Sequence, residues 1–116
     1  MNYLEKENRP WGCFYVIHDE LNYKLKRIEV KPKQRLSYQF HKQRSESWII
    51  IEGNGIVTIN GKDLFVEKGN MVFIKKNDKH RIFNKGNKDL VFIEVQTGSY
   101  FGEDDIVRLK DDYKRK

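Results

Sequence analysis

Four polar residues of the chain can bind a metal ion: Gln39, His41, Glu46 and His80. Gln39 and His41 lie two residues apart in an alternating segment, so in a strand both side chains leave the same face, with Cα atoms roughly 7 Å apart. Glu46 follows across a short polar turn, and His80 comes after a later turn. Two imidazoles, one carboxylate and one amide oxygen suit a divalent first-row transition metal. One such ion is one interpretation of this group, with zinc as the first candidate and Mn, Fe, Co or Ni as alternatives. The other is that the histidines are hydrogen-bonded residues of the core or surface.

Two aromatic residues near this group have simpler interpretations. A lone histidine on a strand is more often a hydrogen-bonded core or surface residue, and we interpret His18 in this way. Trp48 is most simply a core residue, and because it shares the strand face of Glu46, a place beside the metal site is the alternative.

The segments that carry these residues alternate apolar and polar side chains between turn residues, which predicts short β-strands. The predicted strands cover residues 13–18, 23–30, 35–41, 46–52, 55–59, 63–67, 70–74, 80–84 and 90–95. Asn60 and Gly61 predict a tight hairpin, because both accept the positive φ angles of a type I′ turn. A further short strand or turn is expected around Asp105 to Leu109, followed by a solvated charged tail from about residue 110. No segment favours a helix, so an all-β sandwich or barrel is predicted.

Length and composition fit one small domain. A chain of 116 residues has room for a single hydrophobic core, so we expect one domain over residues 1–116. Cys13 is the only cysteine, which excludes an internal disulfide and agrees with a reducing compartment. No apolar run approaches the roughly 20 residues that span a bilayer, and the first residues are charged. We therefore expect a cytoplasmic protein that does not bind membranes.

The formal charge of +6 favours an anionic partner. The Lys and Arg residues are interleaved with Asp and Glu, however, and form no basic stripe with aromatic residues. A small phosphorylated substrate is therefore a better expectation than nucleic acid.

The spacing of the candidate ligands resembles the two signature motifs of the cupin superfamily. The first runs through Gln39, His41 and Glu46 and then six residues to Gly53. The second runs from Gly69 across ten residues to His80 and then three to Asn84. This resemblance implies the cupin double-stranded β-helix, a jelly-roll barrel, and it favours the interpretation of these residues as the ligands of one divalent metal.

A narrower resemblance begins at Gln39, which stands where most cupins have the first histidine of an HxH motif. Five segments look like the cupin domain of type II mannose-6-phosphate isomerases: residues 9–12, 23–32, 34–55, 80–84 and 93–113. That family includes the isomerase half of bifunctional mannose-6-phosphate isomerase and mannose-1-phosphate guanylyltransferase enzymes, and stand-alone domains such as we expect here.

The chain departs from the family pattern at several turn positions. Lys33 stands where the family has Gly, and Lys75 and Asn77 stand where the second motif has Pro and Gly. Asn tolerates left-handed backbone, so the turn before His80 is expected to survive. Lys33 predicts a turn without a positive φ angle after Pro32.

The resemblance implies interconversion of mannose 6-phosphate and fructose 6-phosphate, which moves a proton between C1 and C2 through an ene-diolate. Arg44 lies inside the first motif and is a candidate for charge stabilisation or phosphate binding, because a guanidinium is a poor base. Glu94 alternates with apolar residues and is the candidate base, with a metal-bound hydroxide as the alternative. Lys24, Lys26 and Arg35 are further candidates for binding the phosphate, and each has a solvated basic side chain as its alternative.

Other functions stay open at this point. One is an isomerase or epimerase of the same fold on another sugar phosphate or nucleotide sugar. Another is a non-catalytic cupin that binds a sugar, or a companion to a separate guanylyltransferase. We do not expect guanylyltransferase activity in this chain, because that activity needs a nucleotide-binding domain and 116 residues have no room for one beside the cupin. We also expect a homodimer, with the apolar run 48–51 serving both core and interface.

Overall fold

The computed structural model describes residues 1–115 and builds them into eleven β-strands without a helix. The strand bounds are β1 Glu5–Arg9, β2 Gly12–Asp19, β3 Tyr23–Val30, β4 Tyr38–Phe40, β5 Arg44–Glu52, β6 Asn54–Ile59, β7 Lys62–Glu67, β8 Met71–Ile74, β9 His80–Phe83, β10 Leu90–Gly98 and β11 Val107–Lys110. This part of the chain accordingly has no helix that is long and apolar enough to cross a membrane. The all-β prediction is confirmed.

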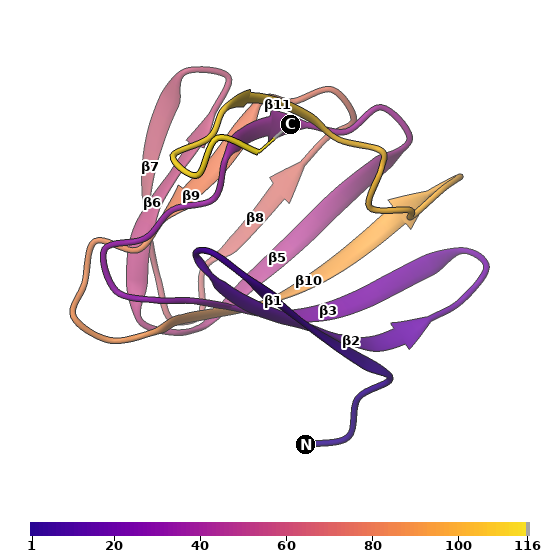
Figure 1. The fold of residues 1–116 in the computed structure, drawn as a ribbon, viewed down its shortest axis with the longest axis horizontal. Coiled ribbons are helices and arrows are strands. Elements are labelled where there is room, and N and C mark those ends of the chain that lie inside the picture. The colour runs from indigo at the N-terminus through magenta and orange to yellow at the C-terminus, as the bar shows by residue number, and fades with distance from the viewer. Residues whose placement is uncertain (116) are drawn as a thin grey trace.

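The strands form two antiparallel sheets that face each other (Figure 1). One has the order β1-β2-β3-β10-β5-β8 and the other β11-β4-β9-β6-β7. Strands far apart in the sequence are neighbours, since β10 lies between β3 and β5, and β9 lies between β4 and β6. Such crossovers between two sheets make the double-stranded β-helix expected from the sequence.

The interior between the sheets has an apolar part and a polar part. Along β5 the buried side chains are Ile50, Trp48, Glu46 and Arg44, in that order toward its start. The neighbouring strand β10 also changes from apolar to polar side chains. Phe92 lies opposite Ile50, whereas Glu94 and Gln96 lie opposite Trp48 and Glu46. The apolar part holds the core, in which the rings of Trp48 and Phe92 lie 4.7 Å apart between centroids. The polar part of the interior holds the side chains that could bind an ion or a substrate.

Strand β1 is not predicted by the sequence pattern. Its five residues are all polar, so no alternation marks it. It is held instead by backbone pairing with β2, from Glu5 opposite Val16 to Arg9 opposite Gly12. Strand β4 is shorter than predicted, and residue 35 forms only an isolated bridge to Phe83.

The C-terminal segment differs from the solvated tail that the sequence predicts. Tyr113 packs against the core and donates a hydrogen bond from its hydroxyl group to Gln34 Oε1. Arg115 binds Asp111 through Nε at 2.8 Å. The aromatic ring at 113 explains the difference, because it buries apolar surface that a solvated tail would expose. Lys116, the last residue of the predicted tail, lies outside the described residues.

The apolar run 48–51, which is predicted to serve both the core and a dimer interface, contains one exposed residue. Ile49 points outward from β5 and lies opposite Met71 of β8, which is also exposed. The homodimer stays a prediction.

Two turns test the backbone angles expected from the sequence, and only the first agrees. Asn60 and Gly61 have φ angles of 49° and 82°, as a type I′ hairpin requires. Lys33 has a φ of 65°, so the expectation of a turn without positive φ was wrong. Pro32 precedes it, Gln34 N donates to Lys31 O at 3.1 Å, and Lys33 N donates to Asn84 O at 2.9 Å. These bonds hold Lys33 at the third position of a type II turn.

Replacing Lys33 by Gly is expected to raise the free energy of unfolding by up to about 1 kcal/mol. The left-handed conformation costs a residue with a Cβ atom about 1–2 kcal/mol, and glycine avoids this cost. Glycine also loses more conformational entropy on folding, which offsets part of the gain. Urea unfolding of the variant measures the change. The matched control is Lys76→Gly, at a turn position without positive φ, which should lower stability. A lower free energy of unfolding in K33G would contradict the claim that the backbone at Lys33 is strained.

Candidate metal centre

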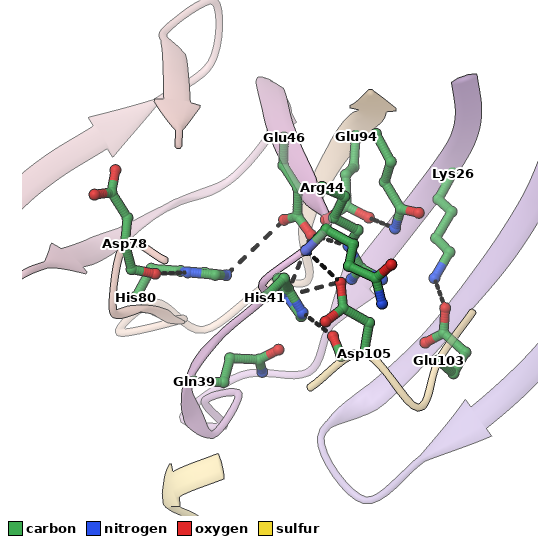
Figure 2. A network of polar contacts seen from close by, with 12 residues as sticks. Lys26, Gln39, His41, Arg44, Glu46, Asp78, His80, Glu94, Glu103 and Asp105 are labelled. Carbon is green, nitrogen blue, oxygen red and sulfur yellow. Dashed lines mark hydrogen bonds and ion pairs between the residues drawn. The ribbon is translucent and has the colours of Figure 1, made fainter. Parts of the chain in front are cut away.

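Three of the four predicted ligands come together in the polar part of the barrel. His41 follows β4, Glu46 lies in β5 and His80 begins β9. The distance is 3.3 Å from His41 Nε2 to Glu46 Oε2 and 3.9 Å from His80 Nε2 to Glu46 Oε1. One donor atom from each residue lies within 4.8 Å of the other two, and all three residues are buried. Figure 2 shows the two imidazoles pointing toward the Glu46 carboxylate.

Backbone carbonyl groups fix the orientation of both histidines. His41 Nδ1 lies 2.6 Å from Asp105 O, and His80 Nδ1 lies 2.8 Å from Asp78 O. A carbonyl oxygen only accepts, so each Nδ1 carries a proton, and Nε2 is the ring nitrogen that each histidine can offer on the Glu46 side. Burial, and then the positive charge of Arg44, lower the pKa of His41 to about 4, which keeps this imidazole neutral. Neutral histidines whose second nitrogen is held by a carbonyl are the usual metal ligands.

The turns that carry these carbonyl groups are themselves held by carboxylates. Asp105 accepts hydrogen bonds from the backbone N–H groups of Lys42 at 3.0 Å and Gln43 at 2.9 Å. Asp78 accepts from Lys75 N at 2.9 Å and from Asn60 Nδ2 at 3.0 Å. Asn77 keeps a φ of 68° in this turn, as expected. Sequence reasoning missed both aspartates as site residues.

Gln39 is the fourth predicted ligand and lies on the same cavity wall. It pairs with His80 across β4 and β9, and its Nε2 donates to Ser37 Oγ at 2.9 Å. The amide nitrogen is thus engaged, and the carbonyl oxygen is the donor that Gln39 can offer to an ion. Two imidazoles, a carboxylate and an amide oxygen fit a divalent first-row transition metal.

Glu46 is a buried carboxylate with two direct donors. Arg44 Nε donates to its Oε2 at 2.8 Å, and Trp48 Nε1 donates to its Oε1 at 3.0 Å. Burial is the largest single effect and raises the pKa of Glu46, but the charges of Arg44 and His80 and the hydrogen bonds with Glu94 and Arg44 together outweigh it and lower the pKa to about 2. Trp48 also packs its ring against His80 at 5.8 Å between centroids, so it lies beside the site. Glu46 is therefore ionised and ready to bind a cation.

A second buried carboxylate, Glu94, lies next to this group. Its Oε1 accepts from Trp48 Nε1 at 3.2 Å, and its Oε2 accepts from Gln96 Nε2 at 2.8 Å. Burial, and then the negative charge of Glu46, raise the pKa of Glu94 to about 7. Two neighbouring carboxylates with separated pKa values are typical of acid–base chemistry.

One cavity joins the ligand candidates to part of the predicted substrate residues. Arg44, Lys26 and Glu94 line it together with Gln39, His41, Glu46 and His80. Lys26 is buried, and its Nζ binds Glu103 Oε2 at 2.6 Å (Figure 2). Lys24 and Arg35 are not among the lining residues. Arg35 instead makes two hydrogen bonds to Asp112, at 2.7 and 2.8 Å.

The two facing sheets and the buried His–Glu–His group between them define a cupin. Residues 1–111 match the family described as mannose-6-phosphate isomerase C-terminal. The chain belongs to this family.

Curated relatives are much longer proteins. The chain is 42% identical over 107 residues to mannose-1-phosphate guanylyltransferase of Klebsiella pneumoniae, covering 92% of this chain and 23% of the relative. It is 43% identical over 110 residues to the xanthan biosynthesis protein XanB of Xanthomonas campestris, covering 95% and 24%. The alginate biosynthesis protein AlgA of Pseudomonas aeruginosa is 42% identical over 107 residues, covering 92% and 22%. The chain thus spans less than a quarter of the length of these relatives.

Solved structures at lower identity share the fold. The capsular polysaccharide assembling protein CapF of Staphylococcus aureus has a TM-score of 0.82 at 20% identity, covering 95% of this chain and 33% of CapF. The Streptomyces nucleoside dehydratase Pac13 has a TM-score of 0.78 at 14% identity, covering 96% and 92%.

We expect the purified protein to contain about one divalent transition metal per chain. His41→Ala and His80→Ala should each lower the metal content at least about tenfold, because each removes a ligand. Elemental analysis by mass spectrometry measures the ratio of metal to protein. His18→Ala is the matched control, since His18 is exposed and binds only Tyr23 Oη among the described side chains. Full metal occupancy in both ligand variants would rule out the site.

Proposed function

We propose that this domain interconverts mannose 6-phosphate and fructose 6-phosphate, with one divalent transition metal bound by Gln39, His41, Glu46 and His80. The observation that carries the proposal is a carboxylate outside the ligand set, Glu94, on the wall of the same cavity. A buried carboxylate whose pKa is raised to about 7 can both take up and return a proton. The family description supports the same reaction, and the relatives XanB and AlgA suggest a role in polysaccharide biosynthesis.

The reaction requires a group that carries a proton between two carbon atoms of the sugar. In this proposal a Glu94 oxygen takes the proton from C2 of the open-chain aldose, and the electrons of the C–H bond form a C1–C2 double bond. The carbonyl oxygen at C1 gains a proton, the hydroxyl at C2 loses one, and Glu94 returns its proton to C1. Trp48 and Gln96 each hold one oxygen of Glu94, which fixes the direction of the carboxylate.

Negative charge develops on the sugar oxygens during this transfer. A divalent metal supplies positive charge that stabilises them when it is bound. Arg44 adds a second source, because its guanidinium is buried, lines the cavity and stays protonated. Its Nη1 has no hydrogen-bond partner among the described residues, although Nε binds Glu46. We assign this nitrogen to a substrate oxygen, since a buried donor without a partner is costly.

Lys26 is a further cavity residue near Glu94, and its contacts are all with the protein. Lys26 lies opposite Glu94 in the pairing of β3 with β10, and it is paired with Glu103. Its ammonium also stands 4.1 Å from the centre of the Phe14 ring. Lys26 therefore has a structural explanation that needs no substrate.

Metal-loaded protein incubated with mannose 6-phosphate should form fructose 6-phosphate, measured with a coupled assay. Glu94→Gln should lower kcat about 100-fold or more, because a general base contributes at least this factor, while the metal content stays unchanged. Removal of the metal with a chelator should abolish turnover, and adding the ion back should restore it.

Glu29→Gln is the matched control for this experiment. Glu29 is a carboxylate on the adjacent strand β3, but it is bound to Arg27 at 2.8 Å and does not line the cavity. Its kcat should equal that of the unmodified protein. Absence of turnover in fully metal-loaded protein would favour a sugar-binding cupin, and an unchanged kcat in E94Q would exclude Glu94 as the base.

A further inference from the structure

The cavity that holds the metal ligands carries an excess of positive charge. Its cationic lining residues are Arg9, Lys26, Arg44, Arg81, Arg108 and Arg115. Its carboxylates are Glu46, Glu94 and Glu103. Lys26 and Arg44 are paired with two of these carboxylates inside the cavity. Because cations outnumber carboxylates on its wall, even before an ion binds, the cavity favours an anionic ligand.

Three of the arginines reach this cavity from separate segments of the chain. Arg9 ends β1, Arg108 lies in β11, and Arg115 follows β11 in the C-terminal segment. Figure 1 shows the β1–β2 hairpin extending toward the side of the barrel that carries the yellow C-terminal segment. Burial lowers the pKa of Arg108, and the positive charges of Arg115 and Arg9 lower it further. Arg9 and Arg115 thus both repel the Arg108 guanidinium, and all three residues line the same cavity.

The known contacts of Arg9 and Arg115 hold these side chains without using all of their donors. Arg9 donates from Nη2 to Glu7 Oε1 at 3.1 Å and from Nη1 to Asn8 O at 3.0 Å, and its guanidinium carbon lies 4.9 Å from the centre of the Phe14 ring. Arg115 binds Asp111 through Nε and Nη2, at 2.8 and 3.3 Å. A guanidinium has more N–H donors than these contacts require. Both side chains are thus positioned in advance and can still bind a ligand.

We propose that Arg9, Arg108 and Arg115 bind the phosphate group of the substrate. Several guanidinium groups converging on one place match the several oxygens of a phosphate, which they can bind in pairs of parallel hydrogen bonds. An uncharged part of a sugar would leave their mutual repulsion in place. The inference rests on the proposed sugar-phosphate activity and adds the position of the phosphate, in the same cavity as the metal ligands. It replaces the sequence candidates Lys24 and Arg35, which lie off the cavity wall.

The test measures binding of inorganic phosphate and of mannose 6-phosphate to the metal-loaded full chain by isothermal titration calorimetry. Arg9→Gln, Arg108→Gln and Arg115→Gln should each weaken binding of both ligands about tenfold, because each removes charge-assisted hydrogen bonds. In the isomerase assay the same variants should raise KM for mannose 6-phosphate with a smaller effect on kcat. Arg27→Gln is the matched control, because Arg27 is paired with Glu29 and lies off the cavity.

The outcomes separate this inference from the proposed function. Weaker phosphate binding in the three variants, in protein that shows no turnover, would support the phosphate site and contradict the isomerase. Normal turnover with unchanged KM and unchanged phosphate affinity in all three variants would overturn the phosphate site alone. Phosphate binding that disappears only in His41→Ala would place the anion on the metal and would also overturn it. Arg115 lies in a surface segment, so R115Q keeps the test decisive if R108Q fails to fold.

Discussion

The polar part of the barrel depends on one buried charge, the carboxylate of Glu46. Taking an ion out of water costs several kcal/mol unless partners replace the water. Arg44 and Trp48 donate to its two oxygens, and the Nε2 atoms of His41 and His80 face it from other segments. Removing this carboxylate would leave Arg44 as a buried cation without its partner and would separate the two histidines from their common centre. The Glu46 carboxylate therefore determines both the arrangement of the candidate ligands and the position of the Arg44 guanidinium.

Trp48 connects this charge to the rest of the interior. Its indole N–H lies between two carboxylates, 3.0 Å from Glu46 Oε1 and 3.2 Å from Glu94 Oε1. Its ring packs on Phe92 in the apolar core on one side and on His80 on the other. A single side chain thus keeps Glu94 beside the ligand group without making it a ligand, which allows the two carboxylates to differ in protonation. The core and the site cannot be altered independently at this position.

Much of this arrangement could be predicted from the sequence, because it follows from local spacing. Alternation marks the strands with one buried face, and the offsets among Gln39, His41 and Glu46 place them on one side. Strand β1 has no such pattern, since its pairing with β2 uses backbone groups that every residue has. The carbonyl group of Asp105 is equally invisible in a sequence. The backbone at Lys33 was mispredicted because a distant bond to Asn84 O holds it, and the arginines of the cavity wall are far apart in the chain.

The bond between His41 and Asp105 joins positions 64 residues apart in the sequence. Contacts of such long separation form late, because a large loop must close before they can form. The lone pair of His41 therefore takes its final direction only after the segment around residue 105 has docked beside the turn at 42–43. A growing chain that still lacks this segment cannot hold an ion in the completed geometry. Binding of an ion in this geometry would therefore require that the segment around residue 105 has docked.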